Sequence, residues 1–297
     1  LPDDVVLASC ATAYGILARR LQPFFHHDFR FRSGDGMSLF SSGVRFLVCA
    51  CALLAIAGTI LLGDASAAPK KPKRVLVVTV TKGFRHDAIP TAERVIQELG
   101  EQSGAFTVDY ARTDDELKAK TTSQALAGYD AVIFALTTGD LPLADRDAFV
   151  EWIKAGHGFV GTHSASDTFH GYAPFISMIG GEFDHHGEQA TVQVMVEDPA
   201  HAATKGLEKS FQTHDEIYLF KNFDKASVHM LLALDKHPNT SEPGYYPLAW
   251  CRQFGKGRVI YTALGHRDDV ITSDWYRKHL LGAIQWALGQ ANGSAKP

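Results

Sequence analysis

Three histidines that lie far apart in the chain each follow a run of apolar residues. His86 comes after residues 74–81, His163 after residues 158–162, and His266 after residues 258–265. Neutral imidazole binds divalent metals, and imidazole exchanges a proton near neutral pH. If the apolar runs are neighbouring parallel strands, their carboxyl ends meet at one edge of a sheet. The spacing therefore predicts that the three histidines converge into a cluster that can do chemistry.

Two kinds of chemistry are compatible with such a cluster. Three histidines and a carboxylate suit a Zn²⁺-type catalytic site with an open position, and the expected metal ligands are His163, His185 and His266. The chain has no HExxH segment or other closely spaced ligand pair, so metal-free acid/base catalysis by neutral histidines is the alternative. In both cases the residues expected to be catalytic are His163, His266, Asp167 and Glu216.

Polar residues beside the histidines are candidates for contacts with a substrate. The residues expected to bind substrate are Arg85, His86, Ser164, Asp215, Trp250 and Arg267. Asp and Arg side chains can grip sugar hydroxyls, and an indole ring can stack on a sugar, although aromatic residues more often belong to the core. The alternative for each polar residue is structural, as a helix cap or as a buried group that finds a hydrogen-bond partner.

The segment GTHSASDTFHGYAPFISMIGGEFDHHG, residues 161–187, carries His163 near one end and the pair His185 and His186 at the other. Adjacent side chains diverge, so at most one of the pair is expected to face inward, and the pattern leaves open which one. The Gly180–Gly181 pair favours a turn that brings these histidines back. We interpret the segment as one wall of a polar pocket.

Alternating strands and helices must position these residues. Predicted strands at residues 74–81, 106–112, 129–136 and 158–165 alternate with helices, among them residues 89–104 and 143–156. This alternation is typical of a parallel, doubly wound α/β sheet. Further strands are predicted at residues 190–198, 216–220, 229–235, 247–254 and 258–265, before a final helix at 273–289. We expect a flavodoxin-like core with an antiparallel extension.

Composition and motifs exclude several functions. The net charge of −4, with 45% hydrophobic and 21% charged residues, is ordinary for a globular protein and gives no electrostatic footprint for nucleic acid. The loop TKGFRH matches neither GxGxxG nor a phosphate-binding loop, so no nucleotide cofactor is expected. Val160 stands where a nucleophile would be expected, and Cys251 lies inside a predicted strand, which argues against acyl transfer through a thiol.

The N-terminal part has the pattern of a secretory signal peptide. After the first methionine, Met37, come Arg45, an apolar run at residues 46–62, and the small residues 65–67. We expect cleavage near Ala67, a linker at residues 68–73 and a domain at 74–290, with residues 1–36 an unstructured upstream extension. The expected location is periplasmic or secreted, without membrane contact after cleavage; the alternative is an uncleaved membrane anchor. Of four cysteines the mature part keeps Cys251, which cannot form an internal disulfide.

Five segments in this order resemble the trehalose-utilisation (ThuA-like) family: KGFRHDAIP, GHGFVGTHSASDTF, MIGGEFDHH, THDEIYLF and PLAWCRQFGKGRVIYTALGH. The resemblance covers residues 74–288. It implies a class I glutamine amidotransferase-like fold without the amidotransferase cysteine, and a role in using disaccharides, often through 3-keto-glycosides. The positions that match the family motifs are His86, His163, Ser164, Asp167, His185, Asp215, Glu216, Trp250 and His266.

Residues and resemblance together predict an exported isomerase, lyase or hydrolase that acts on a sugar or keto-glycoside, with or without a divalent metal. A base such as His163 would remove a proton beside a keto group, and Arg85, His266 or a metal would stabilise the resulting charge. The first alternative is a non-catalytic periplasmic carbohydrate-binding protein. The second is a degenerate amidotransferase fold used for protein contacts, without a pocket at the strand ends.

Overall fold

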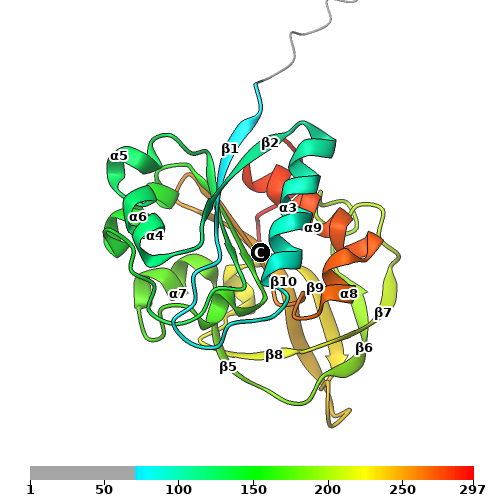
Figure 1. Cartoon of the computed structure of the whole chain (residues 1–297). Helices are drawn as coiled ribbons and strands as arrows, with labels where there is room; N and C mark the ends of the chain where they lie inside the picture. The colour runs from blue at the N-terminus through cyan, green and yellow to red at the C-terminus, as the bar shows by residue number, and fades with distance from the viewer. Residues whose placement is uncertain (1–70) are drawn as a thin grey trace, which may run out of the picture. The chain divides into compact units, whose positions relative to one another are not determined.

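The computed structural model of the protein describes residues 71–297 (Figure 1). The predicted upstream extension at 1–36, the signal peptide at 37–67 and the start of the linker at 68–70 lie outside the described residues. Lys73, the last residue of the predicted linker, already belongs to the first strand. Among the helices of residues 71–297, none combines the length and apolar character needed to cross a membrane.

A nine-stranded sheet runs in the order β2-β1-β3-β4-β11-β10-β9-β6-β7. Its parallel half consists of β1 (Lys73–Val78), β2 (Phe106–Ala111), β3 (Ala131–Ala135), β4 (Gly158–Thr162) and β11 (Gly257–Thr262). Its antiparallel half consists of β10 (Pro243–Phe254), β9 (His229–Lys236), β6 (Ala190–Val196) and β7 (Ser210–Asp215). The predicted α/β fold with an antiparallel extension is confirmed.

The parallel strands are buried on both faces, as their continuous apolar sequences predict. In β1, Val75 and Val77 belong to one core, while Leu76 and Val78 belong to the other. The first core is covered by α3 (Ile89–Ser103), α8 (Asp268–Thr272) and α9 (Asp274–Ala287). The second is covered by α4 (Asp114–Lys120), α5 (Ser123–Leu126), α6 (Arg146–Lys154) and α7 (Ala173–Ile179), which lie on the opposite side of the sheet in Figure 1.

A second, two-stranded sheet pairs β5 (Glu182–His186) with β8 (Tyr218–Lys221). Two short 3₁₀ helices, η2 (His163–Asp167) and η3 (Lys225–Ser227), complete the elements. The predicted strand at 216–220 is partly wrong, because the chain changes sheets there. Asp215 ends β7, Glu216 and Ile217 connect the sheets, and β8 begins at Tyr218. This crossing point places Glu216 beside the carboxyl edge of the parallel strands.

His279, on α9, is a buried histidine whose lowered pKa makes the stability of the fold depend on pH. The side chain is fully buried, and its Nδ1 lies 2.8 Å from the carbonyl oxygen of Ala203. Burial lowers the pKa of His279 from 6.5 to about 4, although the hydrogen bond to Ala203 opposes the shift. The unfolded chain therefore binds a proton at pH 5 that the folded chain excludes, and this difference destabilises the fold as the pH falls below 6.5.

We predict that His279→Gln reduces the loss of unfolding free energy between pH 7 and pH 5 by about 2 kcal/mol relative to wild type. Urea unfolding of both proteins at the two pH values measures this difference. The variant's stability at pH 7 does not matter, because each protein is compared with itself. An equal loss in both proteins would show that His279 is protonated in the fold.

Candidate metal centre at the carboxyl edge of the sheet

Four side chains from distant parts of the chain converge at the carboxyl ends of β1, β4 and β11. They are His86, His163, Glu216 and His266, and one ligand atom from each lies within 4.8 Å of all the others. His86 comes from the loop after β1, His163 is the first residue after β4, and His266 follows β11. The three loops thus bring the histidines together as the sequence predicts, and the crossing between β7 and β8 adds Glu216.

A hydrogen bond orients the His163 ring. Its Nδ1 lies 2.8 Å from the carbonyl oxygen of Ala263, which can only accept, so Nδ1 carries a proton and Nε2 faces the cluster. The Tyr261 hydroxyl donates to the His163 carbonyl oxygen at 2.6 Å and holds the backbone. A ligand histidine whose other nitrogen is bonded to a carbonyl is the usual arrangement around protein-bound metals.

The Nε2 atom of His163 meets two further polar atoms. It lies 3.2 Å from His266 Nδ1 and 3.4 Å from Glu216 Oε2, and these two partners are 3.3 Å apart. Two acceptors at such distances repel each other, so a shared proton or a cation must lie among these three atoms. Metal bonds of about 2.1 Å in tetrahedral geometry place neighbouring ligand atoms about 3.4 Å apart. The donor types, and the spacings among His163, Glu216 and His266, therefore fit a divalent cation of the zinc type, with the ligand atom of His86 within 4.8 Å of the other three.

Burial and neighbouring groups shift the pKa values of His86, Glu216 and His266. Burial, followed by the nearby charges of His163 and His266, lowers the pKa of His86 to about 3, so His86 is neutral at pH 7. Burial alone would raise the pKa of Glu216, but hydrogen bonds from His163 and His266 hold it below its ordinary value. Burial would likewise lower the pKa of His266, and the bond to Glu216 raises it. The cluster thus contains a neutral imidazole beside an ionised carboxylate.

Residues outside the cluster hold its loops in place. Thr138, after β3, donates its hydroxyl to the carbonyl oxygen of Phe84 at 2.9 Å and accepts from the Gly83 N–H at 3.1 Å, which fixes the loop that carries His86. Asp215 is fully buried and accepts the N–H of Gly265 at 2.7 Å. Gly265 has a φ of 105°, which favours glycine, and directs the chain into His266.

Three members of the cluster, His86, Glu216 and His266, form the floor of a cavity of about 310 Å³, which we call the inner cavity, and His163 is buried and does not line it. Its walls are Phe84, Asp167, Phe183, His186 and Tyr218. Asp167 Oδ1 is hydrogen-bonded to His170 Nε2, and His170 Nδ1 lies 2.8 Å from Glu182 Oε1. Burial opposes protonation of His170, but its bonds with the two carboxylates raise its pKa. The inner cavity thus combines aromatic walls with a carboxylate that is paired to a basic imidazole.

The domain matches a known protein family. The sequence profile of the trehalose utilisation (ThuA) family matches residues 74–287. The chain belongs to the ThuA family. This finding confirms the resemblance drawn from the five motifs. A comparison with proteins of curated function finds no match.

Solved structures of ThuA-like proteins share the fold. A ThuA-like protein from Bacteroides uniformis ATCC 8492 is 23% identical, with a TM-score of 0.62, over 78% of this chain and 98% of the other. One from Parabacteroides merdae ATCC 43184 is 20% identical, with a TM-score of 0.61, over 76% of this chain and 93% of the other. At these identities the likeness shows a common fold.

In this ThuA domain, the sharp strand-to-helix turn after β4 carries a histidine. The expectation that Val160 takes the place of a nucleophile is wrong, because Val160 is buried within β4. The strained residue is His163, whose φ of 46° is rare outside glycine. Some hydrolases hold their nucleophile in such a turn between strand and helix. Here the turn presents an imidazole to the cluster instead.

Two of the predicted contacts are wrong for reasons of packing. Trp250 is fully buried, and its indole N–H donates to the carbonyl oxygen of Ile179 at 2.8 Å, so its ring cannot stack on a substrate. His185 bonds to Asp184 on the exposed side of β5 and is not a member of the cluster. A register irregularity between Phe183 and His185 sets the strand's direction, and His186 is the histidine that faces inward.

The remaining predicted residues lie around the cluster in different ways. Ser164 is buried, with its hydroxyl 3.5 Å from His86 Nδ1, and Asp215 supports Gly265 from within the core, so neither lines a cavity wall. Arg85 donates to the carbonyl oxygen of Thr79 at 2.9 Å. Arg267 pairs with Asp269 and lines a neighbouring cavity, outside the inner one. Their roles in substrate binding, like the catalytic roles of the cluster, stay predictions.

Sequence analysis missed Phe84 and His170. Phe84 is 68% exposed at the cavity mouth, and its ring stands edge-on to His86 at 4.9 Å between centroids. Its position two residues before His86 was the available signal. His170 pairs with Asp167, and the spacing of three residues could have indicated the contact.

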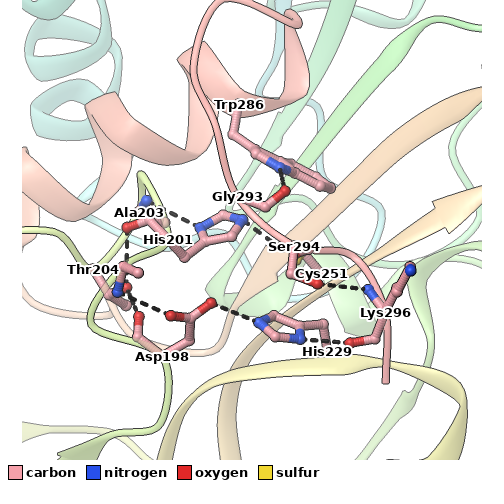
Figure 2. Close-up of polar contacts among 11 residues, drawn as sticks. Asp198, His201, Ala203, Thr204, His229, Cys251, Trp286, Gly293, Ser294 and Lys296 are labelled. Carbon is pink, nitrogen blue, oxygen red and sulfur yellow. Dashed lines mark hydrogen bonds and ion pairs between the residues drawn. The ribbon is translucent and has the colours of Figure 1, made fainter.

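A second group of polar residues, shown in Figure 2, explains why Cys251 is not a nucleophile. His201 accepts the Ala203 N–H at Nδ1, so its Nε2 proton faces Cys251 Sγ at 3.6 Å. The thiol in turn donates to the carbonyl oxygen of Ser294 at 3.4 Å. Burial raises the pKa of the Cys251 thiol. The C-terminal residues thus cover a protonated, inert thiol.

We predict that this ThuA-family protein retains zinc in near-stoichiometric amount, and that His86→Ala, Glu216→Gln or His266→Ala lowers its zinc affinity more than about tenfold, because each removes a ligand. Mass spectrometry of the purified, zinc-loaded proteins measures the content. His185→Ala is the matched control and should keep the wild-type content. Zinc loss in His185→Ala, or zinc-free wild type, would contradict the assignment of the site.

Proposed function

We propose that this member of the ThuA family is an exported enzyme that performs acid/base chemistry on a carbohydrate or keto-glycoside. A divalent cation of the zinc type would be held by His86, His163, Glu216 and His266. The observation that carries the proposal is the convergence of these four buried or half-buried side chains, three of which line the floor of the inner cavity. Perturbed titratable groups in a concave site are a general mark of function.

The chemistry of the donor set supports a Lewis-acid role. A bound divalent cation polarises a carbonyl or hydroxyl oxygen and stabilises the negative charge that develops on it. The same four residues are then engaged as ligands, so proton transfer falls to another group. Asp167 lines the inner cavity but lies outside the cluster, and His170 holds one of its oxygens. We therefore assign the base to Asp167 in place of His163.

Proton removal beside a keto group is the step that these residues support. The Asp167 carboxylate takes the proton from the carbon next to the carbonyl, and the electron pair of that C–H bond moves toward the carbonyl oxygen. In isomerisation of an α-hydroxy ketone, the proton returns to the former carbonyl carbon while the hydroxyl proton passes from one oxygen to the other. In elimination, the electron pair forms a C=C bond as the bond to the β-oxygen group breaks, and that oxygen takes up a proton as it leaves. His170, held between Asp167 and Glu182, keeps the carboxylate oriented.

A carbohydrate substrate is supported by the walls of the inner cavity and by the family's described role in trehalose utilisation. Phe183 and Tyr218 offer aromatic faces, while Asp167 and His186 offer polar groups for hydroxyls. This mixture of aromatic surface and few polar groups is typical of sites for small polar molecules.

We predict that Asp167→Asn lowers turnover of a 3-keto-glycoside by about 10²- to 10⁴-fold, because the amide cannot accept the proton. Hydrogen–deuterium exchange at the carbon beside the keto group, followed by NMR, reports the step directly. Zinc content should be unchanged, since Asp167 is not a ligand. Asp184→Asn, on the exposed side of β5, is the matched control.

Wild-type activity that survives Asp167→Asn would remove this base from the mechanism. Sugar binding by the wild-type protein without turnover or exchange of any keto-glycoside would favour the alternative function, a non-catalytic carbohydrate-binding protein of the periplasm.

Export is proposed from residues 37–67 alone. We predict that expression from Met37 in a bacterial host yields a periplasmic or secreted product that begins near Ala68, because the apolar run ends in small residues suited to cleavage. N-terminal sequencing of the fractionated product measures this. An intact N-terminus retained in the membrane fraction would support the anchor alternative.

A further inference from the structure

His170 joins the proposed base to a second carboxylate, Glu182, which does not line the inner cavity. The Nε2 atom of His170 is hydrogen-bonded to Asp167 Oδ1, and its Nδ1 lies 2.8 Å from Glu182 Oε1. Glu182 is buried, whereas the His170 side chain is 43% exposed and can exchange protons with solvent. Ionised carboxylates can only accept hydrogen bonds. An imidazole that satisfies both of them therefore carries two N–H groups and a positive charge.

We infer that His170 is a positioning residue that limits the proposed base to the pH range in which its imidazole is protonated. The inference rests on the proposed function and adds the regulation of the same site by pH. The imidazolium holds the Asp167 carboxylate in place from behind, and loss of one ring proton breaks that contact.

A neutral His170 keeps its remaining N–H on the side of Glu182. The Gly171 N–H donates to Glu182 Oε1 at 3.0 Å and the Asn222 amide donates to Oε2 at 2.8 Å, so this carboxylate cannot turn away. The Asp167 side chain is 24% exposed, against 4% for Glu182. Loss of a donor costs a buried carboxylate more than one that water can reach. The lone pair of a neutral His170 therefore faces Asp167 and repels it.

Charged groups face His170 from three elements: Asp167 from η2, Glu182 from β5, and Lys221 from β8, whose Nζ lies 3.6 Å from Glu182 Oε1. Burial lowers the pKa of His170, and the bonds with the two carboxylates outweigh it, so the net shift is upward from 6.5. The imidazole thus stays charged until the pH passes this raised pKa. Base catalysis by Asp167 should persist up to that pH and be lost above it.

Hydrogen–deuterium exchange of a 3-keto-glycoside by the zinc-loaded protein tests the inference when it is followed by NMR from about pH 6 to about pH 9, with a protein-free blank. The wild-type rate should fall about tenfold per pH unit above the pKa of His170, because one proton is lost. His170→Arg should keep its rate within about threefold over the same range, because a guanidinium stays charged and can donate to two carboxylates.

Glu182→Gln distinguishes a change in titration from a loss of structure. It removes one of the two negative charges beside His170 without changing Asp167, so the alkaline fall should move to lower pH. His185→Ala is the matched control, because His185 is also paired with a carboxylate, Asp184 at 2.7 Å, but lies outside the inner cavity. It should keep the wild-type pH profile. All three variants should keep the wild-type zinc content, since none changes a member of the cluster.

An alkaline fall that is missing from wild type, or is the same in wild type and His170→Arg, would overturn the inference and leave Asp167 as the proposed base. A His170 ring that titrates at or below 6.5 would overturn it too, and the NMR shifts of the ring protons report this without any substrate. Absence of exchange by the zinc-loaded wild-type protein at every pH would overturn the proposed function, and this inference with it.

Discussion

The site depends on a close contact between His163 Nε2 and the carboxylate of Glu216, which lie 3.4 Å apart, while His163 Nδ1 is bonded to the backbone at Ala263. Two acceptors at this distance in a largely buried site repel each other unless a proton or a cation lies between them. A proton on either imidazole can lie between these atoms, and the four side chains together would hold a divalent cation. The arrangement of the surrounding loops follows from the need to hold these atoms close together.

Backbone strain and buried hydrogen bonds hold these side chains together at the edge of the sheet. His163 sits in a strained backbone conformation that is held by the Tyr261 hydroxyl. The buried Asp215 carboxylate anchors Gly265, and the residue after Asp215, Glu216, turns the opposite way into the cluster. A single crossing between the two sheets thus positions both the support for His266 and the anionic ligand.

The parallel half of the sheet could be predicted from the sequence because its strands are continuous apolar runs. Such runs are the pattern of strands that are buried on both faces. The convergence of His86, His163 and His266 followed from that topology alone. The inward choice between His185 and His186 could not be predicted, because a register irregularity in β5 decides it. Trp250 was misassigned because propensity cannot separate a core indole from an exposed one, and exposure is what distinguishes Phe84.

The turn after β4 shows how one fold can exchange one chemistry for another. A strained turn at the carboxyl end of a central strand directs its side chain toward the cluster. A thiol there would need a neighbouring base, whereas an imidazole needs a partner for its second nitrogen, and the carbonyl oxygen of Ala263 provides it at 2.8 Å. With Nδ1 bonded to Ala263, His163 presents its Nε2 to the cluster. A substrate oxygen that approaches the cluster then meets an imidazole nitrogen, as the proposed function requires.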